Sequence, residues 1–222
     1  MTSTAPALDT RPSVLPPRAT SDGTLRRVQE TALALFAERG YHGVSMRDLA
    51  AAVGMRASSL YVHVASKEDL LLQLILLGHE EHRDGMRTAV LDADGGGSAT
   101  GQLAAATRAH VRMHAAYPTL ALVANNELRS LGPEAQRTVH AVRGDAEGML
   151  RDIIERGVRL GEFDCPDPWL AMAAIGAIGI RVASWYVAGE SPYSVEQVCD
   201  RYAEFALRIA GAELRGGRRA TQ

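Results

Sequence analysis

The sequence predicts an all-α protein of about nine helices, with a small N-terminal unit followed by a larger helical unit. Apolar residues recur three and four positions apart through most of the 222 residues, and no stretch shows the alternation typical of strands. Glycine and proline residues interrupt the pattern at intervals that suit helix ends. The expected divisions are a disordered leader (1–20), a first unit (21–67), a second unit (68–214) and a frayed tail (215–222).

Composition is that of an ordinary globular protein. Hydrophobic residues make up 46% of the chain, which is enough for a buried core, and the formal net charge is −2. The first 67 residues hold eight basic and five acidic side chains, whereas the remainder holds 16 and 21, so the first unit is the more basic one. Two distant cysteines argue against a disulfide framework, and the N-terminus lacks an apolar signal segment. We therefore expect a cytoplasmic protein that does not enter the membrane.

The leader carries four prolines within its 20 residues and no apolar pattern, so we expect it to be disordered. A plain solvated tail is one interpretation. An arm that contacts DNA through Arg11 and Arg18 is the alternative.

Three short helices are expected in the first unit. An apolar face over residues 24–39 predicts the first, and the glycine that follows suits a helix end. Ser45 and Asp48 have the spacing of a capping box, which predicts a second helix over residues 46–53. The third is expected over about residues 57–64, after a glycine turn.

The second and third of these helices have the pattern of a helix-turn-helix, in which the second helix of the motif enters the DNA major groove. Leu60 and Val64 are expected to face inward, whereas the outward positions are small and polar and allow close approach to base edges. The arginine before this helix can reach guanine or phosphate, and the polar side chains after it can donate to phosphate oxygens. The candidate DNA contacts in this stretch are Arg56, Ala57, Ser58, Ser59, Tyr61, His63 and Lys67.

Several of these side chains also have a structural interpretation. Tyr61 can be a core aromatic with a solvated hydroxyl, and His63 can be a surface histidine with its own partners. Lys67, the only lysine of the chain, either contacts phosphate beside a helix N-terminus or is an ordinary solvated residue.

The second unit begins with a long helix that is apolar on nearly all sides. Ser66 and Asp69 have the spacing of a helix cap, and residues 70–77 are apolar apart from Gln73. Such a helix must be covered on several sides, so we expect it to lie between the two units. Further helices are expected over about residues 100–116, 119–130, 133–160, 167–189 and 194–212.

Polar residues on these later helices are candidates for a ligand site. His110, Met113 and His114 share one helical face, and Asn125 and Arg129 lie on the next helix. Two histidine pairs have metal-ligand spacing, and these are His110 with His114 and His79 with His82. No third ligand is evident beside either pair, so no metal site is expected.

Arg181 lies in an otherwise apolar helix, and we expect it to be buried. A buried arginine requires an anionic partner, which is either a protein carboxylate such as Glu127 or a carboxylate or phosphate of a ligand. Trp185 is expected either in the ligand cavity or at an interface between subunits.

Residues 32–54 and 59–71 together resemble the signature of the TetR family of bacterial transcription regulators. The first segment reads ALALFAERGYHGVSMRDLAAAVG and the second reads SLYVHVASKEDLL. Arg56 departs from the family pattern, because a serine or threonine cap usually stands there. Ser58 or the preceding backbone is the alternative cap.

The resemblance implies an N-terminal helix-turn-helix domain, a helical effector domain, and a homodimer built by the helices at about 167–189 and 194–212. It also implies that Ser45, Tyr61, His63 and Lys67 contact phosphate, while Arg47, Arg56 and residues 57–59 lie at or near the bases. Arg47 can instead pair with a nearby acidic side chain.

The function implied is that of a repressor that leaves a palindromic operator when a small hydrophobic effector binds. The C-terminal half around Trp185 resembles family members that sense acyl-CoA, so a fatty acyl or acyl-CoA effector is the leading expectation. A drug or aromatic sensor, a ligand-dependent co-repressor or activator, and a helical adaptor that does not bind DNA are the alternatives. No nucleophile elbow, glycine-rich phosphate loop or carboxylate pair indicates an enzyme, and no cofactor is expected.

Overall fold

The computed structural model describes residues 15–20, 22–93 and 97–213. Over these residues the chain forms nine α-helices and two short 3-10 helices, and the one strand-like pairing is a bridge between Phe163 and Ala212. The helices are α1 (Gly23–Arg39), α2 (Met46–Val53), α3 (Ala57–Leu60), α4 (Lys67–Asp92), α5 (Ala99–Ala116), α6 (Pro118–Asn126), η2 (Leu128–Ser130), α7 (Pro133–Arg159), α8 (Pro168–Ile180), η3 (Arg181–Ser184) and α9 (Val195–Ile209). The predicted all-α fold is confirmed for this part of the chain.

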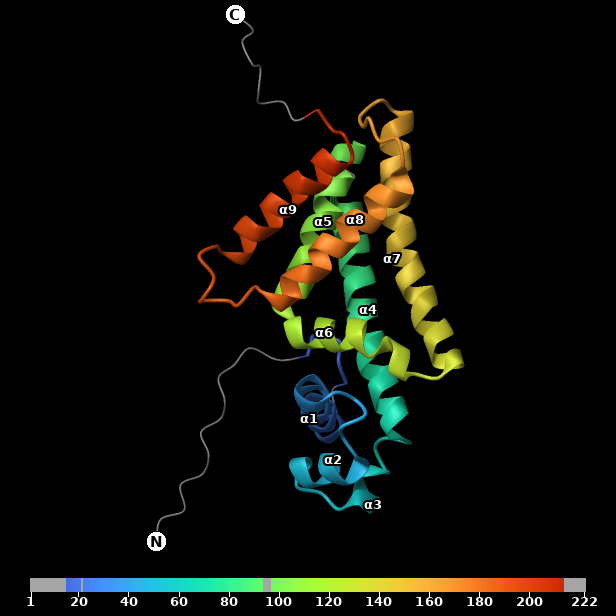
Figure 1. The fold of residues 1–222 in the computed structure, drawn as a ribbon, viewed down its shortest axis with the longest axis vertical. Helices are drawn as coiled ribbons and strands as arrows, with labels where there is room; N and C mark the ends of the chain where they lie inside the picture. The colour runs from blue at the N-terminus through green and yellow to red at the C-terminus, as the bar shows by residue number, and fades with distance from the viewer. Residues whose placement is uncertain (1–14, 21, 94–96, 214–222) are drawn as a thin grey trace, which may run out of the picture.

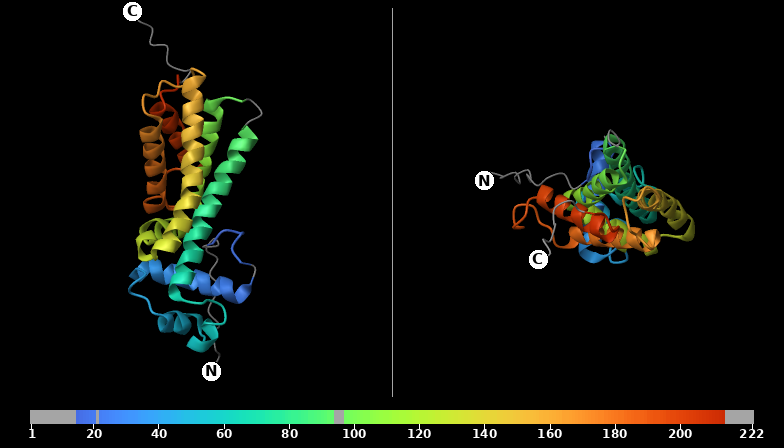
Figure 2. Two further views of the ribbon diagram at one scale, coloured as in Figure 1. Left: turned by 90° about the vertical axis from the view of Figure 1, so that its right-hand side faces the viewer. Right: turned by 90° about the horizontal axis from the view of Figure 1, so that it is seen from above.

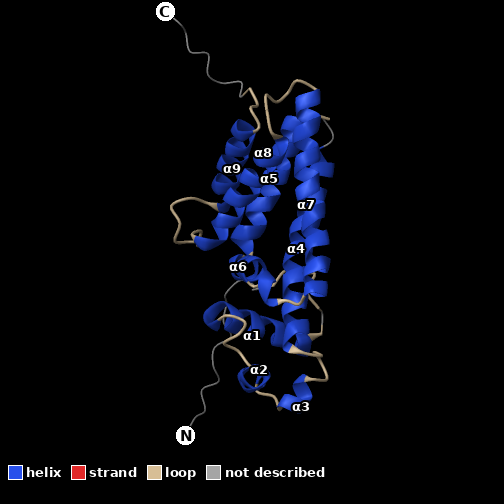
Figure 3. Cartoon of the chain, turned by 45° about the vertical axis from the view of Figure 1, so that its right-hand side comes forward, coloured by secondary structure: helices blue, strands red, loops and turns tan. Residues whose placement is uncertain are grey.

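The molecule is elongated, and α1, α2 and α3 gather at one end (Figure 1). We call residues 23–64 the head and residues 99–209 the body. Helix α4 runs out of the head and along the body, beside α5 and α7 (Figure 2). Helix α6 lies between the head and the upper helices of the body (Figure 3). Helices α4 and α6 therefore connect the head with the body.

Local side-chain caps explain where α2 and α4 begin. The hydroxyl of Ser45 accepts a hydrogen bond from the amide of Asp48, and the Asp48 carboxylate accepts one from the Ser45 amide at 2.8 Å. The hydroxyl of Ser66 accepts from the amide of Asp69 at 3.0 Å. These bonds satisfy amide groups that have no partner inside the helix, so both predicted start points are confirmed.

The third helix is shorter than predicted. Helix α3 covers only Ala57–Leu60, and residues 61–63 form a turn. Arg56 precedes α3 and no side chain caps it, so this helix lacks the local stabilisation that α2 has. Leu60 and Val64 are buried as predicted.

The helix predicted over 167–189 is also too long. Helix α8 ends at Ile180, the chain tightens into η3, and Gly189 at φ +84° lies in the turn that follows. This tightening carries Tyr186 into a buried cluster with Val111 of α5. The end of the helix thus goes together with burial of the aromatic ring, which the apolar pattern of the segment does not reveal.

The leader is not disordered over residues 15–20. Leu15 is fully buried against the core that the head shares with α4. Arg18 donates to the carboxylate of Asp84 at 2.6 Å and also lies 3.6 Å from Glu80, both on α4. Apolar burial and these ion pairs hold the segment, so the expectation of disorder is wrong here, while Arg11 and the frayed tail lie outside the described residues.

One hydrophobic cluster joins the head to the body. It holds Phe36 of α1, Leu49 of α2 and Leu74 of α4 together with Leu120 of α6. A second cluster fills the upper body and includes Met86 of α4, so α4 contributes to both, as its all-round apolar pattern predicted. The hydrophobic core therefore runs without interruption from the head into the body, across the domain boundary expected at residue 67. Among the described helices, none has the length and apolar character needed to cross a membrane.

Candidate functional site

The free end of the head presents an exposed polar surface formed by α2, α3 and the turn after α3. Arg47, Arg56, Ser58 and Ser59 are exposed, and Tyr61 is 54% exposed, which rules out a core position for its ring. Ser45 is also exposed, whereas Ala57, His63 and Lys67 are half-buried. Among the ion pairs formed by the residues that the structure describes, none involves Arg47 or Arg56, so both guanidinium groups remain available to an external anion.

Lys67 has a structural role that the sequence did not indicate. Its ammonium donates to the carbonyl of Tyr41 at 2.9 Å and to that of Val44 at 2.6 Å, and it lies 4.1 Å from the centre of the Tyr41 ring. These contacts hold the connection between α1 and α2, just ahead of Ser45. Lys67 therefore positions the start of α2 whether or not it also reaches a phosphate.

The capping box also sets the charge at the start of α2. Hydrogen bonds from the Ser45 hydroxyl and then from the Ser45 amide lower the pKa of Asp48 from its usual value. The carboxylate is exposed and stays ionised near neutral pH, next to the helix N-terminus that favours a negative charge.

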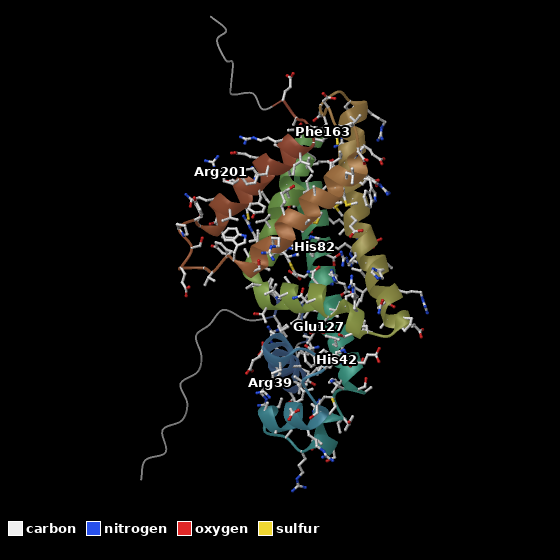
Figure 4. The ribbon with its side chains drawn as sticks, in the orientation of Figure 1. Arg39, His42, His82, Glu127, Phe163 and Arg201 are labelled. Carbon is white, nitrogen blue, oxygen red and sulfur yellow. The ribbon has the colours of Figure 1, made fainter. Side chains whose placement is uncertain are left out.

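A contact between α6 and the head lies at the junction of head and body. Glu127 follows α6, and its carboxylate accepts from the amide of Tyr41 at 3.1 Å and from the Ser130 hydroxyl at 2.7 Å (Figure 4). A second junction bond runs from the amide of Gly132 to the carboxylate of Glu68 at 2.7 Å. Glu127 is thus not the partner of Arg181.

The body encloses a cavity of about 310 Å³ between α4, α5, α6, α7 and α8. Its walls are mostly apolar, with four histidines and one pair of charged side chains among the polar groups. The charged pair is Arg143 and Glu147, 3.4 Å apart on α7. The lining residues are Gly78, His79, His82, His110, Met113, His114, Ala121, Ala124, Asn125, Arg143, Ala146, Glu147, Leu150, Trp169, Met172, Ala173, Gly176, Ala177 and Ile180.

Four of the seven predicted ligand residues line this cavity, namely His110, Met113, His114 and Asn125. The other three do not. Arg129 is exposed beside the head, and Trp185 is 44% exposed beyond η3.

Arg181 is exposed rather than buried, so the expectation that it needs an internal anionic partner is wrong. It follows α8 directly, on the side of the helix that faces solvent in this chain. A helix that is apolar by composition need not be buried all round, and one face of α8 is open.

Burial keeps the cavity histidines uncharged. It lowers the pKa of His79 to about 4 and that of His110 to about 3, and it also lowers the pKa values of His82 and His114. The charge of Arg143 further lowers the pKa of His79. At neutral pH the polar part of the cavity is therefore a group of neutral imidazoles that can donate or accept single hydrogen bonds.

His79 has an unsatisfied ring nitrogen inside this cavity. Its Nε2 is buried and has no hydrogen-bond partner among the described residues, while the ring bonds to the backbone of Ala124. A buried polar atom without a partner is costly, so this nitrogen is suited to meet a polar group of a ligand.

The structure supplies the third histidine that the sequence analysis did not find. His82 of α4 contacts His110 of α5, with 2.6 Å between His82 Nε2 and His110 Nδ1, and His114 lies beside both. The expectation that no third ligand is present is therefore wrong. The spacing of His79 and His82 put them on one face of their helix, but nothing in the sequence showed that this face meets α5.

Large apolar side chains remain exposed on α8 and α9. Leu170 is 57% exposed and Phe205 is 43% exposed, and Ile209 lies one helical turn beyond Phe205. Helix α9 is amphipathic, with Val198 and Ala206 on its buried side. These two helices thus share an outer surface with more apolar area than a solvated face requires.

Comparison with known proteins agrees with this arrangement. Residues 29–74 match the family model described as "Bacterial regulatory proteins, tetR family", and residues 96–210 match the model "Tetracyclin repressor-like, C-terminal domain". A solved tetR-family regulatory protein from Rhodococcus RHA1 is 30% identical, with a TM-score of 0.80 over 88% of this chain and 100% of that one.

Two curated relatives are regulators. The transcriptional repressor KstR2 of Rhodococcus jostii is 27% identical over 86% of this chain and 95% of its own, and the fatty acid metabolism regulator protein of Bacillus subtilis is 26% identical over 72% and 81%. The fold of AibR, solved with isovaleryl coenzyme A and operator DNA, is also similar, with 21% identity and a TM-score of 0.73 over 85% of this chain and 99% of that one.

Proposed function

Because the chain belongs to the tetR family of bacterial regulatory proteins, which are DNA-binding transcription regulators and not enzymes, we propose that it represses transcription until an acyl-CoA thioester enters its body cavity. The observation that carries the proposal is a largely apolar cavity bounded by α6, the helix whose following residue bonds to the head. Membership of the family supports the part of the proposal that concerns DNA binding. The chemistry of the cavity supports the part that concerns the effector.

The proposed DNA-contacting surface is the exposed end of the head. Arg56 lies just before α3 and is exposed, and a guanidinium group there can bond to a guanine edge or to a phosphate. Tyr61 and His63 follow α3 and are proposed to donate to phosphate oxygens, as is the Ser45 hydroxyl. Lys67 is proposed to act mainly through the contacts that hold the α1–α2 connection.

The proposed effector site is the body cavity. Its volume lies at the lower end of the range for small-molecule sites, which favours a short or branched acyl group inside and the coenzyme A portion outside. Trp169 lines the cavity and is 58% exposed, so it marks a side that is open to solvent. Neutral histidines can donate to the thioester carbonyl. The names of the B. subtilis regulator and of the AibR complex agree with this ligand class.

The proposed path from effector to DNA runs through α6 and α4. Ala121 and Ala124 of α6 and His79 of α4 line the cavity, so a ligand that spreads these helices must move both. Glu127 would transmit a movement of α6 to Tyr41, and the start of α4 would transmit one to the third helix of the head. A coupling free energy of about 1–3 kcal/mol corresponds to roughly 5–150-fold weaker DNA binding.

We expect Arg56→Ala to weaken binding to the DNA upstream of the chain's own gene by about 10–100-fold, because it removes one charged donor from the major-groove surface. Fluorescence anisotropy of labelled DNA measures this. Adding isovaleryl-CoA or octanoyl-CoA to the wild-type complex is expected to release the DNA, whereas free coenzyme A is not.

Arg159→Ala is the matched control, since Arg159 is an exposed arginine at the far end of α7 and should leave the affinity unchanged. Equal affinities for the wild type and Arg56→Ala, with the same salt dependence, would contradict the proposed contact surface. If the protein binds the DNA tightly and aromatic drugs release it but no acyl-CoA does, the protein is still a repressor, and its effector is an aromatic compound instead of an acyl-CoA.

The proposed dimer uses the outer surface of α8 and α9. A two-fold dimer presents two copies of α3 to a palindromic operator, so each half-site meets the same surface. Leu170, Phe205 and Ile209 are exposed in the single chain and would become buried between the subunits. The exposed Arg181 lies next to this surface and would sit at its edge.

Leu170→Arg is expected to convert the dimer to a monomer at micromolar concentration, because the guanidinium would be buried without a partner at the interface. Sedimentation velocity measures the change. Leu91→Arg is the matched control, since Leu91 is 65% exposed on α4, away from α8 and α9. If Leu170→Arg and Leu91→Arg form dimers of equal stability, the subunit interface does not include this surface of α8 and α9.

A further inference from the structure

Three histidines from two helices meet in the wall of the body cavity. His82 comes from α4, and His110 and His114 come from α5 (Figure 4 labels His82). One ring nitrogen of each lies within 4.8 Å of a ring nitrogen of both others. The ring centres of His110 and His114 are 4.6 Å apart, and that of His82 is 4.7 Å from His110.

Backbone hydrogen bonds orient two of these rings as they would be oriented in a metal site. His114 Nδ1 faces the carbonyl of His110 at 2.8 Å, and His110 Nε2 faces the carbonyl of Gly176 at 3.1 Å. A carbonyl oxygen only accepts, so each of these nitrogens carries the proton and the opposite nitrogen of each ring carries the lone pair. Metal-bound histidines in proteins are held by this type of second bond.

The third ring supplies the remaining lone pair. His110 Nδ1 has no proton, so His82 Nε2 now donates to it across 2.6 Å. Moving that proton to His82 Nδ1, the other tautomer of the ring, would turn two lone pairs toward one point. Nitrogen ligands at about 2.0–2.1 Å from Zn²⁺ in tetrahedral geometry lie about 3.3 Å apart. The close pair, at 2.6 Å, must therefore open slightly, while the pairs with His114 already lie within 4.8 Å. Side-chain rotations provide movements of that size.

The surroundings leave room for an open coordination position. Three protein ligands plus one exchangeable ligand is the arrangement of accessible zinc sites, and here the cluster borders a cavity rather than solid core. Glu147 and Arg143 both line this cavity and pair with each other, so together they bring no net charge to the site.

We propose that His82, His110 and His114 form a binding site for one Zn²⁺ ion per chain, with the fourth coordination position facing the body cavity. Imidazole ligands suit zinc among the common divalent ions, whereas magnesium and calcium prefer oxygen ligands. An ion there adds an electrophilic point to the cavity wall, which can hold a water molecule or an oxygen atom of a bound effector. The site does not depend on the proposed effector, because its ligands come entirely from this chain.

The test uses full-length protein that has been treated with chelator and freed of any affinity tag. Zn²⁺ is titrated against a competing chromophoric chelator, and Co²⁺ serves as a spectroscopic probe. We expect one Zn²⁺ per chain, and strong visible absorption from Co²⁺ that indicates tetrahedral geometry with nitrogen ligands. His82→Gln and His114→Gln are each expected to weaken Zn²⁺ binding by at least about 100-fold.

His140→Gln is the matched control, because it removes one exposed imidazole from α7 and should leave Zn²⁺ binding unchanged. Circular dichroism and thermal melts establish that each variant is folded. If His114→Gln does not fold, the His82→Gln comparison and the Co²⁺ spectrum of the wild type decide the matter. A wild-type stoichiometry well below one, a weak six-coordinate Co²⁺ spectrum, or equal binding by His82→Gln and the control would overturn the proposal.

Discussion

Lowering the pH from about 7.5 to about 5 is expected to reduce the free energy of unfolding by about 4 kcal/mol through His79 and His110 alone. Burial lowers their pKa values to about 4 and about 3, from the ordinary value of 6.5 in the unfolded chain. Below pH 6.5 the unfolded chain therefore binds more protons than the folded one. Stability from these residues is fully present above that pH and is lost progressively as the pH falls toward 4 and 3.

The chosen pH window separates histidines from carboxylates. Asp84 has its pKa lowered to about 2, chiefly by its hydrogen bond with Arg83, and the pKa of Glu162 is lowered by hydrogen bonds from the backbone of Thr100. Such groups stabilise the fold above their unfolded pKa values and lose that contribution only at pH values below those of the window. A loss of stability between about pH 7.5 and 5 therefore reports mainly on buried imidazoles.

Denaturant unfolding at both pH values, in the presence of a chelator and at one protein concentration, measures the effect. His79→Gln removes one titrating group from the cavity and is expected to lose about 2 kcal/mol less than the wild type over the same window. The comparison cancels effects of pH on dimerisation that both proteins share. If the wild type and His79→Gln lose stability equally, His79 is not buried in its neutral form.

Gly157→Ala is expected to lower the free energy of unfolding by about 3 kcal/mol, because the added methyl group has no room. Gly157 lies near the end of α7, and a Cβ there would overlap ring atoms of the buried Phe163 (Figure 4 labels Phe163). The ring is held by its own backbone, since the Phe163 amide donates to the Gly157 carbonyl at 3.2 Å. Phe163 also pairs with Ala212 just beyond α9, so a shift of the ring disturbs the contact between α7 and α9.

Gly144→Ala on the same helix provides the control. Gly144 is exposed, and a Cβ there meets nothing within 4 Å. This change should stabilise the protein by up to about 1 kcal/mol, because alanine has the higher helix propensity. Denaturant unfolding of the two variants should therefore move in opposite directions. Equal effects would mean that Phe163 does not pack on Gly157 in solution.

Local interactions made a large part of the fold predictable. Helices α2 and α4 begin where Ser45 and Ser66 indicate, because a cap depends on side chains three residues apart. The helix-turn-helix and its exposed polar residues follow from the same kind of short-range pattern. Helical spacing made His110, Met113 and His114 ligand candidates, and Asn125 was a candidate as a polar residue of the next helix; all four line the cavity.

The remaining features of the fold and of the candidate site depend on contacts between segments that lie far apart in the sequence. The order of the helices, the caps of α2 and α4 and the family signature were readable from the sequence alone, since these depend on residues close together in the chain. The packing of the helices on one another is what buries Leu15, leaves Arg181 exposed and brings His82 to two histidines 28 and 32 positions away. A helical pattern specifies which residues share a face but not which helix covers it, because that choice depends on how all the apolar faces are buried together.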